Sequence, residues 1–238
     1  MKSAACVMEW SDYRAEIISL DLSVSDEVVT RLIREVDKLG IDIPLGWPIA
    51  FVEAVARHSR DGTWPETYRH ADIEAYRYRR TDVHVREKVA IAPLSVSTDR
   101  IGIPAMRAAA LLATIRPRVP LDGSGRVVEV YPAAALRRWG LSWRQYKGSD
   151  HAEERRALVE AFADQTGDWL GLSHQDRTRC EDSDDAFDAL IAACVARASA
   201  VNAVEPIPDA DLDAARREGW IALPSEGSLG TLVKDSEA

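Results

Sequence analysis

The chain has 238 residues, of which 46% are hydrophobic and 29% are charged, and this balance argues against a disordered or membrane class. No apolar run approaches the roughly 20 residues that a spanning helix needs, and the N-terminal segment is too short and too polar for a signal peptide. The formal net charge of -9 weighs against a protein that coats itself in nucleic acid, because phosphate binding draws on Lys and Arg. We therefore expect a cytoplasmic protein with no membrane partner.

The cysteines are odd in number, scattered, and without a C-x-x-C spacing: Cys6, Cys180 and Cys194. Such a pattern argues against both a disulfide framework and a thiolate zinc site. We predict that they are small buried hydrophobic residues.

The first 45 residues predict a hairpin, a helix and a strand. Residues 3–10 and 14–22 are β-rich runs joined by a short polar turn, which is typical of an antiparallel hairpin. Ser25 is a plausible N-cap for a helix with apolar residues at helical spacing, and Gly40 ends that helix. Residues 39–43 then form a short buried strand.

The rest of the chain alternates helical patterns with one further strand and ends in a polar tail. The predicted elements are helices at residues 49–58, 105–115, 132–139, 151–162 and 183–200, a strand at 127–131 and a last short run at 220–223. This order implies a mixed sheet with helices on its faces. The fold class is therefore α/β, and ligands of such sheets bind beyond the carboxyl ends of the parallel strands.

The polar stretch between the helices at 49–58 and 105–115 combines arginines with aromatic residues. Such a composition suits a polyanionic partner stacked on aromatic rings. The alternative is a solvated face with internal ion pairs, and the general behaviour of charge runs favours it. The residues concerned are Arg69, Arg77, Arg79, Arg80, Arg86 and Lys88 with Tyr76 and Tyr78, and the acids for internal pairing are Asp72, Glu74, Asp82 and Glu87.

Two acidic residues coincide with predicted strands. Asp42 leaves the strand at residues 39–43, and Glu129 lies inside the strand at residues 127–131. A charge in an otherwise apolar strand is costly unless it is paired or coordinates a metal. Each carboxylate could therefore be a metal ligand, or it could cap a helix or pair with an arginine.

The helix at residues 183–200 begins with three acids on one face. Asp185 and Asp188 are three residues apart, and Asp184 and Asp188 are four apart, so they are neighbours on the helix surface. Asp184 and Asp185 have a structural explanation, because first-turn acids suit the helix dipole after the N-cap Ser183. Asp188 precedes a run of apolar residues and is the acid that structure alone explains least.

Several motifs in one order resemble domain-of-unknown-function family 429, whose members are described as predicted nucleases with an RNase H-like fold. The motifs are residues 40–46 (GIDIPLG), 79–82 (RRTD), 97–99 (STD), 129–132 (EVYP), 146–148 (YKG) and 184–190 (DDAFDAL). The resemblance extends over nearly the whole chain. It implies one RNase H-like domain over residues 1–224, a mixed sheet with flanking helices, and a polar tail at 225–238.

The same resemblance implies a hydrolase site for two Mg²⁺ or Mn²⁺ ions, which prefer hard oxygen ligands and together activate water and stabilise a leaving oxygen. The implied catalytic residues and metal ligands are Asp42, Glu129, Asp185 and Asp188. The implied substrate-binding residues are Arg79, Arg80, Asp82 and Lys147.

One departure from the family pattern concerns the first strand. In that pattern a strand with a Gly-hydrophobic-Asp motif precedes the run at residues 3–10 and supplies the first catalytic carboxylate, whereas this chain begins after it. Either translation starts further upstream, which we favour, or a central strand has been lost. In both cases we expect this chain to be impaired as a nuclease. We expect that restoring roughly 15 upstream residues, about one strand and its turn, would raise the melting temperature and any nuclease activity together.

Three classes of function follow. The leading one is a metal-dependent nuclease, with the arginine-rich stretch facing nucleic acid. The second is a non-catalytic RNase H-like module that binds nucleic acid or protein, as a monomer or a homo-oligomer. The third, a phosphotransferase, would need a glycine-rich phosphate loop, and residues 123–125 precede a strand where such a loop would follow one. A Ser, Cys or His hydrolase is weaker still, because the histidines lie in no nucleophile motif.

Overall fold

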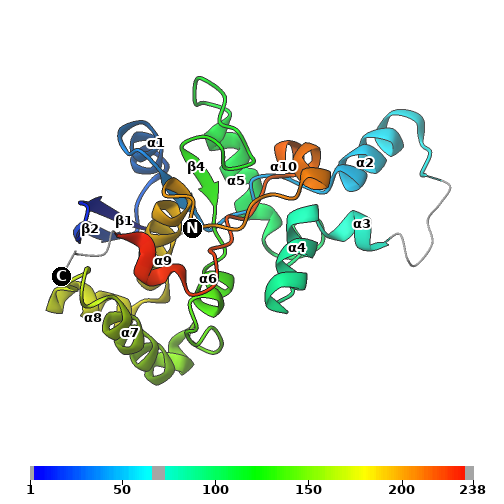
Figure 1. Cartoon of the computed structure of the whole chain (residues 1–238). Helices are drawn as coiled ribbons and strands as arrows, with labels where there is room; N and C mark the ends of the chain where they lie inside the picture. The colour runs from blue at the N-terminus through cyan, green and yellow to red at the C-terminus, as the bar shows by residue number, and fades with distance from the viewer. Residues whose placement is uncertain (1–2, 66–72, 234–238) are drawn as a thin grey trace. The chain divides into compact units, whose positions relative to one another are not determined.

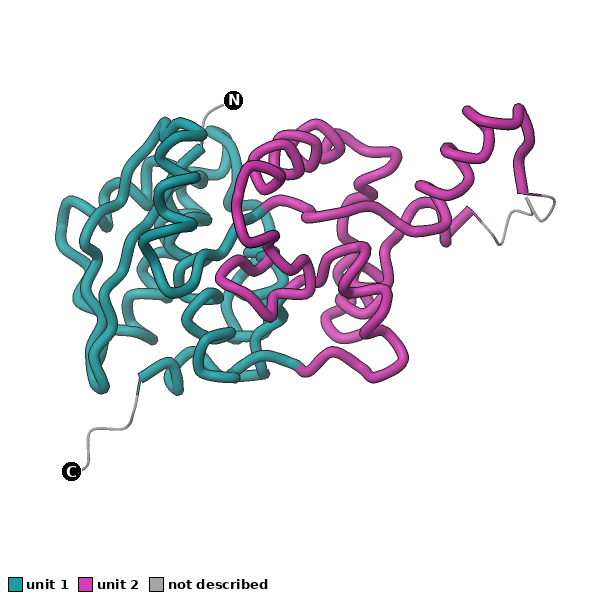
Figure 2. The backbone as a smooth tube through the Cα atoms, turned by 90° about the horizontal axis from the view of Figure 1, so that it is seen from above, with its two compact units in different colours: residues 1–42, 130–205, 222–238 teal, residues 43–129, 206–221 magenta. Residues whose placement is uncertain are grey.

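The computed structural model describes residues 3–65 and 73–233, drawn in Figure 1. These residues divide into two compact units, and each unit takes segments from separate parts of the chain (Figure 2). Unit 1 holds residues 3–42, 130–205 and 222–233, and unit 2 holds 43–65, 73–129 and 206–221. The expectation of one domain over residues 1–224 stays a prediction.

Unit 1 begins with the predicted hairpin. Strand β1 (Ala4–Trp10) pairs antiparallel with β2 (Ala15–Leu22), with Ala4 opposite Leu22 and Trp10 opposite Ala15. The turn is closed by Ser11, whose backbone N–H and side-chain hydroxyl both donate to the carbonyl of Arg14. The alternating pattern of the two runs is thus confirmed as a hairpin.

Helix α9 is the central helix of unit 1. It contacts β1, β2, β3, α6 and α8, and its side chains Phe187, Leu190 and Ile191 are fully buried. The other elements of this unit are α1 (Asp26–Glu35), β3 (Leu39–Ile41), α6 (Pro132–Arg138), η1 (Ser149–His151), α7 (Ala152–Thr166), α8 (His174–Asp182), α9 (Asp184–Ala200) and η3 (Ser228–Leu232). The last of these, η3, buries Leu229 and Leu232 within the segment predicted as a polar tail.

Strand β3 lies directly against α9 because Gly40 has no side chain. A Cβ atom at Gly40 would lie 2.3 Å from the carbonyl oxygen of Ala192, which is backbone and cannot move aside. The N–H of Val130 donates to the carbonyl of Ile41 over 2.9 Å. Val130, from the run at residues 127–131, is therefore bonded to β3, and the end of β3 is fixed beside the first half of α9.

Unit 2 is mostly helical. It contains α2 (Ile49–Asp61), α3 (Ile73–Arg77), α4 (Arg80–Val89), α5 (Gly102–Leu112), β4 (Val127–Glu129), η2 (Asp209–Asp211) and α10 (Leu212–Glu218). Within it Ile221, from the predicted last run, forms an isolated parallel bridge with Glu129. The chain is thus a mixed α/β protein with more helix than strand.

Helices α4 and α8 were not predicted from the sequence, because both are strongly polar. Helix α4 begins with a reciprocal contact: the Asp82 carboxylate accepts from the N–H of Arg79, the N-cap residue, as in a capping box. Its buried face is made of residues such as Thr81 and Val85. Arg69 and Asp72 of the arginine-rich stretch lie outside the described residues.

The cysteine prediction agrees with the described residues. Cys180 and Cys194 are buried, Cys6 is half-buried, and all three are free thiols. Burial raises the pKa of Cys180 to about 12, so this thiol is neutral and packs as a small apolar group. Across residues 3–65 and 73–233, no helix is both long enough and apolar enough to cross a membrane.

Candidate functional site

Unit 1 brings two of the predicted acids to one lysine. The Nζ atom of Lys147 lies 2.6 Å from Oδ2 of Asp188 and 4.0 Å from Oδ2 of Asp42. Asp42 directly follows β3, and Asp188 lies in the second turn of α9, one turn before Ala192. The close approach of Gly40 to Ala192 therefore explains why carboxylates so far apart in sequence face the same ammonium group.

The loop that carries Lys147 is held on both sides. The hydroxyl of Tyr146 donates to Oδ1 of Asp188 over 2.8 Å, and the N–H of Gly148 donates to Oδ2 of Asp184 over 2.8 Å. Tyr146 is buried, whereas Lys147 has 51% of its side chain exposed. Tyr146 therefore anchors the loop in the core while Lys147 faces the acids from the solvent side.

Arg155, a buried residue of α7, holds this loop in place through hydrogen bonds to its backbone. Its Nη1 atom donates to the carbonyls of Tyr146 and Gly148 over 2.9 and 3.0 Å, and its Nε atom donates to the carbonyl of Glu181 at the end of α8. One guanidinium group thus joins the lysine loop to the segment that leads into α9. Its position in a polar helix gave no sequence signal for this role.

The electrostatics of the cluster reflect its partial burial. Burial raises the pKa of Asp188 above its ordinary value, and the ammonium group of Lys147 and the hydroxyl of Tyr146 act against this rise. Burial by itself would lower the pKa of Lys147, but Asp188 and Asp42 raise it above its ordinary value. Since 40% of the Asp42 side chain is exposed against 12% for Asp188, the cluster is open to solvent on the Asp42 side.

Of the two acids in the first turn of α9, Asp184 rather than Asp185 faces the cluster. Asp184 accepts from Gly148 and adds to the negative potential at Lys147 and Asp188. Asp185 is exposed, and its backbone N–H donates to the Asp184 carboxylate. The spacing of these acids predicted a shared face but could not tell which of them reaches the neighbouring loop.

The predicted ligand Glu129 lies in unit 2, where its carboxylate pairs with Arg79. Nη2 of Arg79 donates to Oε1 over 2.6 Å and Nη1 donates to Oε2 over 2.7 Å, while Oε2 also accepts from the N–H of Leu45. Burial raises the pKa of Glu129, and Arg79 opposes that rise. Pairing with an arginine, one of the alternatives left open for Glu129, is the arrangement found.

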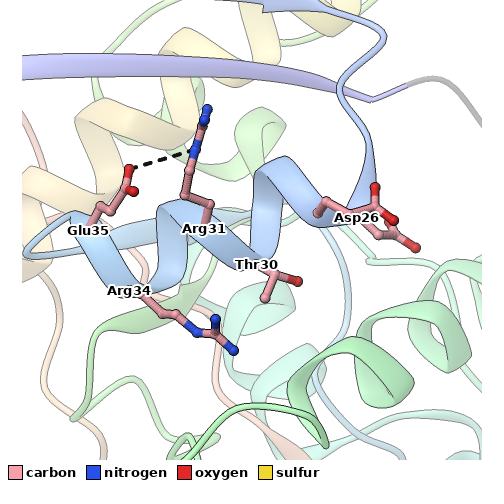
Figure 3. A pocket seen from close by; sticks show the side chains of 6 residues that line it. Asp26, Thr30, Arg31, Arg34 and Glu35 are labelled. Atoms are coloured by element: carbon pink, nitrogen blue, oxygen red, sulfur yellow. Dashed lines mark ion pairs between the residues drawn. The ribbon is translucent and has the colours of Figure 1, made fainter.

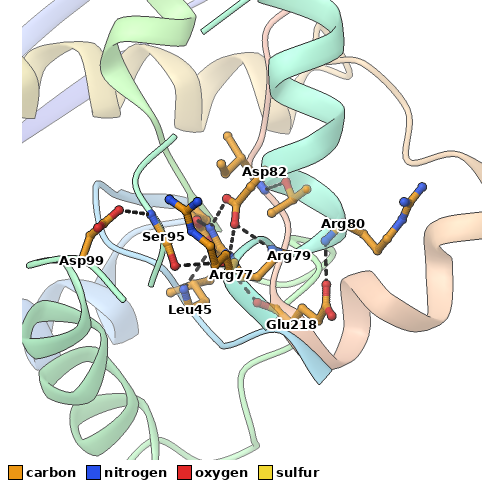
Figure 4. Close-up of polar contacts among 11 residues, drawn as sticks. Leu45, Arg77, Arg79, Arg80, Asp82, Ser95, Asp99 and Glu218 are labelled. Atoms are coloured by element: carbon orange, nitrogen blue, oxygen red, sulfur yellow. Dashed lines mark hydrogen bonds and ion pairs between the residues drawn. The ribbon is translucent and has the colours of Figure 1, made fainter. Parts of the chain in front are cut away.

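Asp82 completes this buried network, and Figure 4 shows it beside Arg79. Oδ1 and Oδ2 of Asp82 accept from Nη2 and Nε of Arg79 over 2.8 and 3.1 Å. Burial would lower the pKa of Arg79, but Glu129 and Asp82 raise it above its ordinary value. With Arg79, Asp82 and Glu129 each 2% exposed or less, the network is closed to solvent.

The same region of unit 2 contains a further buried carboxylate, that of Glu218. Its Oε1 accepts from the N–H of Ile49 over 2.8 Å and its Oε2 accepts from the N–H of Arg80 over 2.7 Å. These N–H groups are the first of α2 and of α4, so one carboxylate satisfies two helix N-termini. Glu218 is a structural residue that no sequence motif indicated.

The predicted substrate-binding residues therefore lie in different environments. Arg79 and Asp82 are buried in their mutual ion pair, and Lys147 lies in the acidic cluster of unit 1. Arg80 has 55% of its side chain exposed and pairs with Asp211 over 2.8 Å. Among these four residues, only Arg80 and Lys147 present charge to solvent.

The 97–99 motif contributes a turn. The Asp99 carboxylate accepts from the N–H of Ser95 over 2.7 Å, and the Ser95 hydroxyl donates to the carbonyl of Arg77 (Figure 4). Both bonds lie within unit 2. They hold the segment after α4 against the end of α3, which is a structural role.

A surface pocket of unit 1 lies along α1 and shares no residue with the cluster of Asp42, Lys147 and Asp188. Figure 3 shows its lining, which comes from α1 alone and includes an ion pair between Arg31 and Glu35 at 3.7 Å. No residue predicted for the metal or substrate lines this pocket. We therefore base the candidate site on the cluster of Asp42, Lys147 and Asp188.

The carboxylates of Asp42 and Asp188 could hold a metal ion only if the ammonium group of Lys147 moved away. Within residues 3–65 and 73–233, no three Asp, Glu, His or Cys side chains are grouped so as to hold a metal ion. Asp42 and Asp188 supply two carboxylates, and the space between them faces the ammonium group. A divalent ion at this position would have to replace that ammonium group and take its other ligands from water, as Mg²⁺ commonly does.

The family resemblance of the motifs is supported by a comparison with family models. A model described as "Protein of unknown function (DUF429)" matches residues 1–213. No match was found among curated proteins or solved structures. The matched range covers most of the chain and includes the acidic cluster and the Arg79 network. The chain belongs to the DUF429 family.

Proposed function

We propose that this protein is a metal-dependent phosphodiesterase that acts on nucleic acid, with Mg²⁺ or Mn²⁺ held by Asp42 and Asp188. We also propose that the α/β fold of the chain is RNase H-like. The observation that carries it is the convergence of two carboxylates, from a strand end and a buried helix, on one ammonium group. Burying the carboxylate of Asp188 costs free energy that packing alone does not offset. A buried acid that binds a cation would have a functional reason to be there.

Each residue of the cluster would have a separate role in this reaction. Asp42 and Asp188 bind the cation, Tyr146 orients Asp188 through its hydroxyl, and Arg155 holds the loop. A bound divalent ion supplies Lewis-acid chemistry and lowers the pKa of a water molecule. With a cation bound, the ammonium group of Lys147 would leave the two carboxylates and would be free to hold a phosphate oxygen, a role that suits a point charge on a flexible stem.

Glu129 and Asp185 are left out of this ligand set. Both oxygens of Glu129 already accept hydrogen bonds within unit 2, and releasing them would leave Arg79 buried without that partner. Asp185 is exposed on the first turn of α9, and it is Asp184 that contacts the lysine loop. We therefore propose one ion at Asp42 and Asp188 rather than the two-ion site that the resemblance implies.

A cleavage assay tests this function. Purified protein should cleave labelled DNA or RNA with Mn²⁺ or Mg²⁺ and not with EDTA, and Asp188→Asn should lower the rate at least tenfold. Asp185→Asn is the matched control, since it makes the same change on the same helix at an exposed position and should leave the rate unchanged. Cleavage that persists in EDTA, or that Asp188→Asn leaves intact, would contradict the proposal.

A second candidate is a binding module without catalysis. The observation in its favour is that Lys147 already balances the charge of Asp188, so the cluster is satisfied without any ion. This function predicts binding of a polynucleotide or protein with no hydrolysis under any divalent ion. Binding of nucleic acid that is equal with Mn²⁺ and with EDTA, together with no cleavage, would favour it over the enzyme.

A further inference from the structure

The loop that carries Lys147 also carries an aromatic ring that contacts two cationic side chains. The guanidinium carbon of Arg144 lies 4.3 Å from the centre of a Trp143 ring, and that of Arg137, from α6, lies 5.4 Å away. Trp143 is half-buried and both arginines are exposed. We call Arg137, Trp143 and Arg144 the Trp143 platform.

The charges of this platform are available to a ligand. Within residues 3–65 and 73–233, neither Arg137 nor Arg144 lies in an ion pair with a carboxylate. The arginine-rich stretch of unit 2 has a similar cluster around Tyr78, but there Arg77 and Arg86 both pair with Glu74, at 3.9 and 3.2 Å. The arginines around Tyr78 are thus paired with a carboxylate, whereas among the described residues those of the Trp143 platform are not.

The backbone joins the platform to the acidic cluster. Gln145 has a φ of 54°, a left-handed conformation that is uncommon for a residue other than glycine. It separates Arg144, which is exposed, from Tyr146, which enters the core. Because Trp143 and Lys147 are only four positions apart in the chain, their Cα atoms are at most about 14 Å apart. One extended ligand could therefore contact both.

We propose that the Trp143 platform binds an unpaired base of a single-stranded polynucleotide, with the adjoining phosphate directed toward Lys147. This inference rests on the proposed function and names the substrate class of the same site. Bases of a single strand present free faces that stack on aromatic rings and guanidinium planes, and these contacts tolerate any sequence. Bases inside a duplex are already stacked, so the platform favours single strands. Local positive charge also explains how a chain with a net charge of -9 can bind a polyanion.

The test is a binding measurement in EDTA, which removes any contribution of catalysis. Fluorescence anisotropy of a labelled oligonucleotide should show tighter binding to the single strand than to the duplex of the same sequence. Trp143→Ala should weaken single-strand binding about tenfold, the size expected for one lost stacking contact. Arg144→Gln should weaken it less and lower the slope of affinity against salt by about one ion.

Two controls keep the result interpretable. Trp143→Phe retains an aromatic face and should keep most of the affinity, so it separates stacking from a folding defect in Trp143→Ala. Tyr78→Ala removes the ring of the other cluster and should change binding little. Equal loss in Trp143→Phe and Trp143→Ala, or a larger loss in Tyr78→Ala, would overturn the proposal.

Other outcomes distinguish the ligand and the two proposals. Equal binding of duplex and single strand would overturn the single-strand inference. Displacement by polyglutamate as effective as that by oligonucleotide would also overturn it, in favour of an acidic protein partner. Normal single-strand binding in EDTA with no cleavage under Mn²⁺ would contradict the proposed enzyme and support the platform.

Discussion

The Arg79 network of unit 2 and the Lys147 cluster of unit 1 each place one cation between two carboxylates, and they differ in access and in donor geometry. Arg79 gives fork-shaped pairs to Asp82 and Glu129, with all three residues nearly inaccessible. Lys147 gives one short contact to Asp188 and one long contact to Asp42, and half of its side chain is exposed.

From this difference we infer that the Arg79 ion pair is structural and that the Lys147 ion pair is exchangeable. A guanidinium group held by four side-chain contacts in a closed site cannot leave without stranding buried charge. An ammonium group is a single point charge on a flexible stem, and at a solvent-accessible site water can replace it. The same residue classes thus stabilise the fold in unit 2 and are suited to ligand exchange in unit 1.

The largest expected effect comes from removing the cation of the closed network. Arg79→Gln should lower the free energy of unfolding by about 3 to 5 kcal/mol, because it leaves Asp82 and Glu129 buried without a positive partner. Urea denaturation measures this loss. The neighbouring Arg80→Gln breaks a half-exposed pair with Asp211 and should cost at most about 1 kcal/mol. Similar losses in the two variants would contradict the distinction.

A smaller effect is expected for the carboxylate that joins two helix N-termini. Glu218→Gln should lower the free energy of unfolding by about 1 to 2 kcal/mol, since it removes the charge and one acceptor from the first N–H groups of α2 and α4. Denaturation midpoints give the value. Glu53→Gln, in an exposed pair with Arg217, is the control and should change little; if it matched Glu218→Gln, the capping role would be wrong.

The smallest effect should appear at alkaline pH in the open cluster. Burial and the neighbouring Asp188 raise the pKa of Tyr146 in the folded chain. Burial lowers the pKa of Lys147, but Asp188 and Asp42 raise it above its ordinary value. Their stabilisation is therefore complete below the unfolded values of about 10 and is lost as pH rises through the folded values. Urea midpoints should fall from pH 8 to pH 11, and Tyr146→Phe should show a smaller fall than the wild type. An equal or larger fall would contradict this assignment.

Local patterns in the sequence predicted much of the fold and part of the site. The hairpin, α9 and its N-cap Ser183 follow from periodicity and capping chemistry, which depend on neighbouring residues. Asp188 was identified because it precedes a run of apolar residues, where a buried helix would favour an apolar side chain. Its partner Lys147 lies 41 positions earlier, so the sequence alone could not show that these two residues form an ion pair.

The remaining features depend on contacts between distant segments. Arg79 and Glu129 are 50 residues apart, and nothing in either motif shows that they saturate each other. Arg155 donates to backbone carbonyls. Because every residue has a carbonyl, the sequence cannot show which ones it binds. Helices α4 and α8 are stabilised by tertiary packing rather than by an apolar stripe, so periodicity did not detect them.

The exchangeable character of the Lys147 cluster is tested most directly by Mn²⁺ binding, measured by titration calorimetry. Lys147→Met removes the competing ammonium group and should bind Mn²⁺ at least tenfold more tightly than the wild type, while Asp188→Asn should abolish binding. Lys88→Met, which removes an exposed lysine of α4, should match the wild type. Unchanged or weaker binding by Lys147→Met would contradict the account, because it would mean that Lys147 does not occupy the place of a cation.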